Sequence, residues 1–180
     1  MKPLLICLIG PSGSGKTSLS MHLQKTLNIP PIVSYTTRPM RFEETQGVEH
    51  HFVSEWRIPP RNRMLAHTVF HGYDYWTELK QIDHDIMTYT IDEKGLLELE
   101  KKHGDKFNIF SVYIQREEEE LVRHVGTERV DRDKERLKLP LGYYSLVIEN
   151  DCNNLDAFLY MGNFLISKAL KKWQQTAKNQ

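Results

Sequence analysis

The sequence predicts an α/β fold whose helices cover a mostly parallel sheet. Three observations support this fold class: a buried-strand pattern near the start, a glycine-rich turn directly after it, and a continued alternation of strand-like and helical segments. Strands that alternate with helices produce layered folds of this kind. The length of 180 residues suits a single domain with its own hydrophobic core.

The first strand is predicted over residues 4–9. This segment is a continuous apolar run that ends in glycine and proline, as expected of a parallel strand buried on both faces. A helix is expected over 18–27, because leucines recur there four residues apart and form one apolar stripe. Pro30 and Pro31 cannot continue that helix. A second strand is predicted over 32–37.

The stretch 38–80 differs in character from the segments around it. It is rich in aromatic residues and histidines and carries several prolines between short β-like pieces, which indicates an inserted lobe. The alternation resumes after this lobe. The further expected elements are a strand over 85–91, a helix over 93–103, a strand over 107–114, a helix that begins at 117–120, a charged segment over 123–139, a strand over 144–148 and a terminal helix over 155–173.

The overall charge excludes some classes of partner. Lys and Arg number 24, as do Asp and Glu. A protein held by nucleic-acid phosphates or by an anionic membrane usually has a basic excess, so we expect neither partner, and any anion site must be local. No apolar run approaches the roughly twenty residues that cross a bilayer. The two cysteines lack motif spacing, which favours a reducing compartment such as the cytoplasm.

Residues 10–17 read GPSGSGKT and fit the pattern G-x-x-x-x-G-K-[ST] between a predicted strand and a predicted helix. Glycines let consecutive amide groups point into one concavity, which phosphate oxygens fill. Lys16 brings a positive charge to the terminal phosphates, and Thr17 offers a hydroxyl to Mg²⁺. A glycine-rich turn with a chance lysine is the alternative, which the flanking elements disfavour. The residues expected to bind ATP in this segment are Gly10, Pro11, Ser12, Gly13, Ser14, Gly15, Lys16, Thr17 and Ser18.

A second anion site is expected in the segment SYTTRPMR. Arg38 and Arg41 lie three residues apart and close to Ser34. One guanidinium group can donate two parallel hydrogen bonds to the oxygens of a phosphate, so these residues suit a second, smaller phosphorylated ligand. The alternative is a surface turn stiffened by Pro39.

Further arginines follow in the charged segment at positions 129, 132 and 136. A charged helix with this composition closes over phosphates in some enzymes, as a lid. A helix face exposed to solvent is the alternative interpretation.

The motifs together resemble the guanylate kinase family. The matching motifs stand in the order and approximate spacing of that family. They are GPSGSGKTSL, VSYTTRPMR, GVEHHFVS, HGYDYWT, TID, GTERVDRDKERL and LVIEND. The resemblance extends from Leu4 to about Leu159. It implies a P-loop kinase with a three-layer α/β/α core, a mixed-β lobe for the acceptor nucleotide over about 34–80 and a small helical lid over about 121–137.

The resemblance also implies roles for individual residues. It assigns the donor nucleotide to residues 10–18 and Asn150, and catalysis to Lys16, Arg132 and Arg136, with Thr17 at the metal. The residues that it assigns to the acceptor are Ser34, Arg38, Arg41, His50, Tyr75, Thr77 and Asp92. Two of these differ from the family: His50 replaces a tyrosine and brings a charge that changes near neutral pH, and Thr77 replaces a serine that contacts the base.

Other departures concern the base pocket and the lid. Ala66 replaces the glutamate that pairs with the guanine edge, and alanine cannot form that bond. His67 or Glu78 are the candidates to compensate for it. Trp76 replaces a glycine, and Thr90 replaces an aspartate. In the lid, Val125 replaces an arginine for which Arg123, Arg129 or Arg132 is expected to substitute.

The expected reaction is in-line transfer of the terminal phosphoryl group of Mg-ATP to a nucleoside monophosphate, with GMP or dGMP as the first choice. Two alternatives remain at this point. One is a P-loop kinase for another small phosphorylated metabolite such as ribose 1,5-bisphosphate. The other is a non-catalytic interaction module, which Lys16 and Thr17 disfavour because a pure binding module does not need both.

Overall fold

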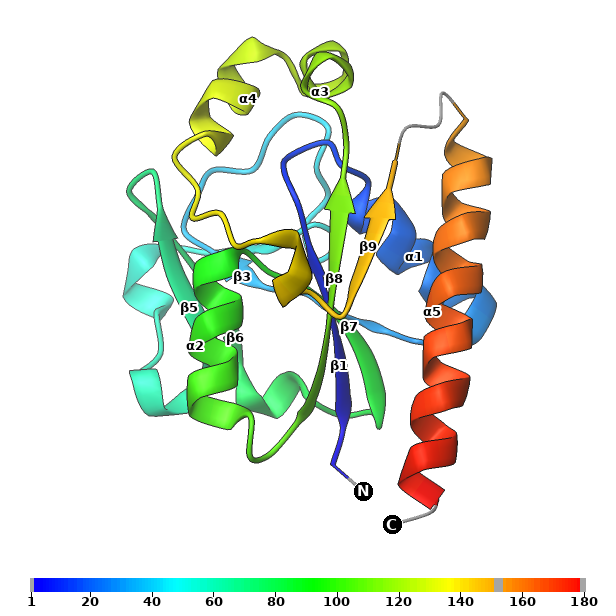
Figure 1. Ribbon diagram of the computed structural model, residues 1–180. Coiled ribbons are helices and arrows are strands. Elements are labelled where there is room, and N and C mark those ends of the chain that lie inside the picture. Colours follow the sequence, from blue (N-terminus) through cyan, green and yellow to red (C-terminus); the bar gives the residue numbers. More distant parts are fainter. Residues whose placement is uncertain (1, 151–153, 179–180) are drawn as a thin grey trace.

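The computed structural model describes residues 2–150 and 154–178, with side chains through residue 175. Its central sheet has the order β2-β7-β1-β8-β9, and all the pairings in it are parallel. The strands of this main sheet are β1 (Leu4–Ile9), β2 (Pro31–Ile32), β7 (Ile86–Thr90), β8 (Asn108–Gln115) and β9 (Leu146–Glu149). The predicted parallel α/β sheet is therefore confirmed (Figure 1).

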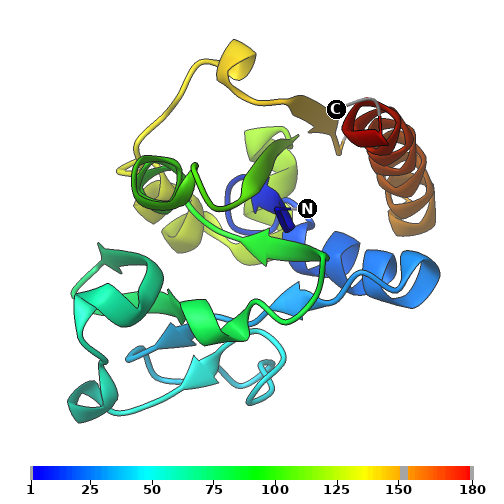
Figure 2. The same ribbon diagram turned by 90° about the horizontal axis from the view of Figure 1, so that it is seen from below.

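Helices cover both faces of the main sheet. The helices are α1 (Lys16–Leu27), α2 (Glu93–His103), α3 (Glu118–Val125), α4 (Thr127–Asp133) and α5 (Leu155–Lys178). Viewed from below in Figure 2, α2 lies on one side of the sheet, and α1 and α5 lie on the other. None of the helices in the described ranges is both long enough and apolar enough to span a bilayer.

The core consists of two apolar layers that share β1. Successive residues of a strand point to opposite faces, so Leu5 and Ile9 pack toward Leu96 of α2. On the other face, Leu8 packs with Leu19 of α1 and with α5. The six residues of β1 are all buried, which explains why its sequence is continuously apolar and not alternating.

A second sheet of mixed direction is inserted between β2 and β7. Its order is β4-β3-β6-β5, with β3 and β4 parallel and the other pairs antiparallel. The strands are β3 (Tyr35–Thr36), β4 (His51–Phe52), β5 (Met64–Phe70) and β6 (Tyr73–Glu78), and short 3₁₀ helices lie at η1 (Glu55–Arg57), η2 (Arg61–Arg63), η3 (Leu79–Gln81) and, outside this sheet, η4 (Leu141–Tyr143). The predicted mixed-β insertion is confirmed.

The prediction of one strand over 32–37 is wrong. Ile32 pairs with Tyr89 of the main sheet, whereas Tyr35 pairs with Trp76 of the second sheet. The chain thus passes from one sheet to the other within a few residues. Residues of high strand propensity on both sides of the crossing hide it, because a sequence pattern records exposure and not which sheet a residue joins.

The predicted helix that begins at 117–120 is α3, and the charged segment after it contains a second helix, α4. Gly126 separates α3 from α4, and its φ of 81° lies in a region that residues with a side chain rarely adopt. Figure 1 shows both helices above the carboxyl ends of β1 and β8. This is the edge at which open parallel sheets bind ligands.

Candidate active site

A cavity of about 320 Å³ lies between the main sheet, the second sheet and the lid helices. The lysine and arginine residues among its described lining residues are Lys16, Arg38, Arg41, Arg129, Arg132 and Arg136. They come from the glycine-rich loop, from the loop after β3, and from α4 with the segment after it. Positive charge from separate parts of the chain is therefore gathered at one cavity, although the total charge of the chain is zero.

The glycine-rich loop joins β1 to α1 in a shape that requires glycine. Gly10 and Gly15 have φ angles of 149° and 102°. A Cβ on Gly15 would lie 2.7 Å from the ring of Phe158, and one on Gly10 would lie 2.5 Å from a carbonyl oxygen of β8. Ser12, Gly13, Lys16 and Thr17 line the cavity, so the predicted donor loop faces it.

Lys16 is held against its own loop. Its Nζ donates hydrogen bonds to the carbonyl oxygens of Gly10, at 2.9 Å, and Pro11, at 2.7 Å. Burial and the nearby Arg136 guanidinium lower the pKa of Lys16 to about 7. A phosphate group at the loop would reverse this effect, because an anion favours the charged form of the amine.

The other predicted donor residues support the loop. The Asn150 amide donates to the Ser14 carbonyl at 2.9 Å and so ties β9 to the loop. Ser18 belongs to the first turn of α1 and is not among the residues that line the cavity. Arg116, which the sequence analysis missed, donates to the Gly13 carbonyl at 3.0 Å. Its position after β8 carries no sequence motif that would reveal this contact.

Three polar side chains of the lid bond to the loop. Asp133 accepts a hydrogen bond from the Ser12 amide at 2.5 Å, and Arg132 donates to the Ser12 hydroxyl at 3.1 Å. Arg136 donates to the Gly10 carbonyl at 2.5 Å and pairs with the buried Glu93 at 2.8 Å. The two lid arginines predicted to be catalytic are thus both at the loop.

Val125 packs where the family has a lid arginine. A Cβ on Gly13 would lie 2.7 Å from its methyl group, so Val125 covers the loop without supplying a charge. Arg132 contacts the loop, whereas Arg129 pairs with Glu43 of the second lobe and Arg123 pairs with Glu120 on the lid surface. Arg132 is therefore the best placed of the three candidates to take the missing role.

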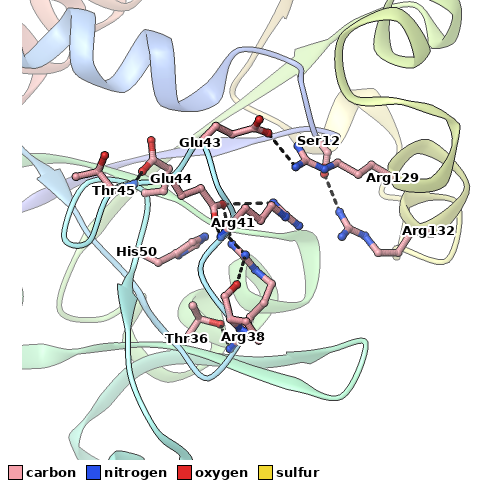
Figure 3. Close-up of polar contacts among 12 residues, drawn as sticks. Ser12, Thr36, Arg38, Arg41, Glu43, Glu44, Thr45, His50, Arg129 and Arg132 are labelled. Carbon is pink, nitrogen blue, oxygen red and sulfur yellow. Dashed lines mark hydrogen bonds and ion pairs between the residues drawn. The ribbon is translucent and has the colours of Figure 1, made fainter.

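The arginine pair of the second lobe is organised by a glutamate. Glu44 accepts two hydrogen bonds from Arg38, at 2.8 and 2.9 Å, and one from the backbone amide of Arg41 at 2.8 Å (Figure 3). Burial acts to raise the pKa of Glu44, but the bonds from these arginines outweigh it and lower the pKa. Glu44 is not among the residues predicted from the sequence, although an acid three residues after Arg41 is a visible signal.

His50 and Tyr75 complete this end of the cavity. The Ser34 hydroxyl lies 2.8 Å from His50 Nδ1, and the His50 and Tyr75 rings meet edge to face at 5.6 Å between centroids. Burial and the charge of Arg38 lower the pKa of His50 to about 4. The expectation that His50 changes its charge near neutral pH is therefore wrong: it is neutral there and serves as a hydrogen-bonding group only.

The wall expected to contact a base is largely uncharged. Ala66 lines it, whereas Thr77 is fully buried, bonds to the Tyr89 hydroxyl at 2.6 Å and is not among the lining residues. Thr77 is paired with Ala66 across the two strands, so the two side chains are on the same face of the second sheet, and a contact of Thr77 with a base stays a prediction. His67 lines the cavity, but its Nε2 is bound to Asp74 at 2.5 Å.

Of the remaining candidates, Glu78 forms ion pairs with Arg63 and Lys80 and is not among the lining residues. It does not compensate for the missing glutamate in this structure. Asp92 lines the cavity and caps α2, since its carboxylate accepts from the Gly95 amide at 2.7 Å. Thr90 lines the same wall.

The three-layer core, the glycine-rich loop and the second arginine-lined lobe define the class of this protein as a P-loop nucleotide kinase. Comparison with known proteins is consistent with that class. Residues 2–156 match the family model of guanylate kinase. The chain belongs to the guanylate kinase family.

Individual relatives are similar over most of the chain. A guanylate kinase of Blochmanniella floridana is 30% identical over 93% of this chain and 88% of its own length. A guanylate kinase of Helicobacter hepaticus is 28% identical, with 89% and 82% covered. The crystal structure of guanylate kinase from Anaplasma phagocytophilum superposes with a TM-score of 0.65 at 21% identity, over 93% of this chain and 86% of that one.

Proposed function

We propose that the protein transfers the terminal phosphoryl group of Mg-ATP to a nucleoside monophosphate, with GMP or dGMP as the first acceptor. One observation carries the proposal: an intact phosphate loop and a separate arginine pair, Arg38 and Arg41, line the same cavity. Two phosphate-binding groups that face one space suit a reaction between two phosphorylated ligands. The guanylate kinases that are similar over most of this chain support GMP as the acceptor.

The residues present fit Mg²⁺ and ATP. The positive φ angles of the loop glycines give the turn a shape that side chains would not allow, since a Cβ on Gly10 or Gly15 would collide with neighbouring protein atoms, and Thr17 lines the cavity at this loop. Among the described residues no cluster of three acidic, histidine or cysteine side chains suits a metal ion. That agrees with Mg²⁺, which is usually held by one or two protein groups together with substrate phosphates. Thr17 would hold it, with Asp92, which lines the same cavity, as the carboxylate.

Catalysis would consist mainly of positioning and charge neutralisation. When bound, Mg²⁺ neutralises charge on the phosphates. Lys16, Arg132 and Arg136 would stabilise the charge of the transferring group, because all three contact the phosphate loop. Arg38 and Arg41, fixed by Glu44, would hold the acceptor phosphate in line. The lid would exclude water from the transferring group.

The uncharged wall at Ala66 favours a second candidate. A wall without the family's glutamate does not select a guanine edge by a buried charge-assisted bond, and a smaller acceptor such as ribose 1,5-bisphosphate needs no base contact. A non-catalytic interaction module is the third candidate. It is disfavoured because Lys16 and Thr17 both face the cavity.

An ADP-release assay across GMP, dGMP, AMP, CMP, UMP, dTMP and ribose 1,5-bisphosphate tests these candidates. We expect turnover with GMP or dGMP. Turnover with ribose 1,5-bisphosphate alone would select the second candidate. No ADP release with any acceptor would support the third candidate and contradict the proposal.

The Lys16→Ala variant tests the role of the loop directly. We expect its turnover to fall by about a thousandfold or more, as is typical when a charge that stabilises a transition state is removed. Lys25→Ala is the matched control, since Lys25 lies on the same helix and is exposed. Equal turnover of Lys16→Ala and the unmodified protein would rule out the assignment.

A further inference from the structure

A carboxylate of the lid lies on the phosphate loop. Asp133 Oδ2 accepts a hydrogen bond of 2.5 Å from the Ser12 amide, and the Asp133 residue is only 9% exposed. Amide groups of such loops point into the concavity that receives phosphate oxygens. The side chain of the protein itself therefore uses a group that the loop offers to its anionic ligand.

The surroundings of Asp133 are those of a bound phosphate. Arg132 Nη2 lies 3.4 Å from one carboxylate oxygen and Arg136 Nη1 lies 3.9 Å from the other. Arg132 also reaches the Ser12 hydroxyl. Burial acts to raise the pKa of Asp133, but the bonds from Ser12 and the charges of Arg136 and Arg132 outweigh it and lower the pKa. Asp133 is therefore an anion at neutral pH.

The same residues would bind the terminal phosphates of a nucleotide. The loop amides, Lys16 and the two lid arginines are the groups that neutralise phosphate charge in P-loop kinases. A carboxylate carries the same sign of charge and accepts the same hydrogen bonds as a phosphate oxygen. Asp133 and a phosphate group cannot both accept the hydrogen bond from the Ser12 amide, so one excludes the other.

We propose that Asp133 is an internal anion that holds the lid on the phosphate loop and that the terminal phosphates of the nucleotide must displace. The inference rests on the proposed function in one respect, the identity of ATP as the ligand of the loop. Asp133 would thereby lower the affinity for ATP, and its release would be the event that couples nucleotide binding to the position of the lid.

The contacts of the lid with the second lobe carry this coupling further. Arg129 pairs with Glu43 at 3.2 Å, and the Arg132 guanidinium lies 5.4 Å from the centre of the Phe70 ring. In Figure 3 Arg129 extends to Glu43 of the second lobe, and Arg132 extends to Ser12 of the loop. A lid that turns to release Asp133 therefore also moves side chains that face the acceptor site.

Direct binding measurements on the Asp133→Asn variant test the proposal. Asparagine keeps the size of the side chain but loses its charge. We expect the Kd for ATP, measured by calorimetry, to fall by about tenfold, which corresponds to the loss of one charge-assisted hydrogen bond that competes with the ligand. Asp131→Asn is the matched control: Asp131 lies on the same helix, is exposed and pairs with Lys134, so its Kd should stay unchanged.

Two further probes separate competition from a structural effect. Inorganic tripolyphosphate should gain affinity for Asp133→Asn as ATP does, whereas AMP, which lacks the terminal phosphates, should not. A Kd for ATP that is unchanged or weaker in a folded Asp133→Asn variant would overturn the proposal, as would an equal gain for AMP. If Asp133→Asn does not fold, the Kd for ATP is measured on Asp133→Ala. The ATP dependence of the thermal transition of the unmodified protein is measured beside it. A loss of ATP affinity in Asp133→Ala would count against the proposal.

These measurements do not depend on phosphoryl transfer. ATP binding with the expected gain, but without turnover on any acceptor, would leave the role of Asp133 in place and remove the kinase proposal. Failure of both the unmodified protein and Asp133→Asn to bind ATP or tripolyphosphate would overturn both.

Discussion

At the scale of single residues, Glu44 is the group that allows two positively charged arginines to lie close together. Arg38 is 8% exposed, and its guanidinium is held by both oxygens of Glu44. Buried positive charges so close to each other need a shared counter-ion. Because Glu44 uses its two oxygens on the edge of Arg38 and the amide of Arg41, it also fixes the direction in which both side chains point.

Replacement of Glu44 by glutamine should weaken the acceptor site selectively. Glutamine keeps the shape but leaves the two arginines without a counter-ion, so we expect KM for the acceptor to rise by about tenfold or more, with KM for ATP nearly unchanged. Steady-state kinetics with each substrate varied in turn provide the measurement. Glu55→Gln is the control, because Glu55 of η1 is exposed in the same lobe and is not among the residues that line the cavity. Equal effects of the two substitutions would refute the special role of Glu44.

The residues that the sequence predicted best are those fixed by a local motif. Lys16 and Thr17 could be placed from eight consecutive letters, because strand, turn and helix determine where they point. The burial of Thr77 could not be predicted, since it depends on a contact with Tyr89 of β7 that no local pattern records. Asp133 and Arg116 depend on contacts over more than a hundred residues, and no local pattern records such contacts.

At the scale of elements, the lid consists of two short helices whose relative direction depends on Gly126. Its φ of 81° is available to glycine at little cost and is strained for other residues. A Cβ added at Gly126 would meet nothing within 4 Å. The conformation itself, and not the available space, therefore selects glycine there.

The substitution Gly126→Ala isolates this effect. We expect it to lower the free energy of unfolding, measured with urea, by about 1–2 kcal/mol, and to lower turnover because α4 changes its direction. Gly142→Ala is the matched control: a Cβ there also meets nothing within 4 Å, but the φ of Gly142 is not positive. Its unfolding free energy should stay within about 0.5 kcal/mol of the original. The same loss of stability in both variants would show that the backbone angle is not the cause.

At the scale of the whole molecule, the fold concentrates cations that the sequence keeps far apart. Lys16 and Arg136 are 120 residues apart in the chain, yet both contact the Gly10 carbonyl. The zero net charge of the chain does not reveal such a concentration. It follows from the topology, which brings the loop after β1, the insertion and the lid to one edge of the main sheet.

This concentration predicts that ATP binding takes up a proton. In the free protein burial and Arg136 lower the pKa of Lys16 to about 7, so above pH 7 the amine is mostly neutral. Bound phosphate raises that pKa again. The uptake should therefore be close to one proton near pH 8 to 9 and vanish toward pH 6, where Lys16 is already charged. Calorimetry in buffers of different ionisation enthalpy measures it. The uptake should disappear in Lys16→Met, and an equal uptake at pH 6 and pH 8.5 would contradict the assignment to Lys16.

The crossing of the chain between the two sheets has a mechanical consequence. Within the described residues, the strand pairings keep β3 to β6 in one sheet and β2 and β7 in the other. The two sheets are joined in sequence by Val33 and Ser34 on one side and by the segment from η3 to β7 on the other. Since no backbone ladder joins the two sheets there, the packing of β5 on α2 and the bond from the His67 amide to Glu98 set how the sheets lie against each other. Because Ser34 belongs to one of these connections and also lines the cavity, a ligand that binds at Ser34 contacts the link between the two sheets.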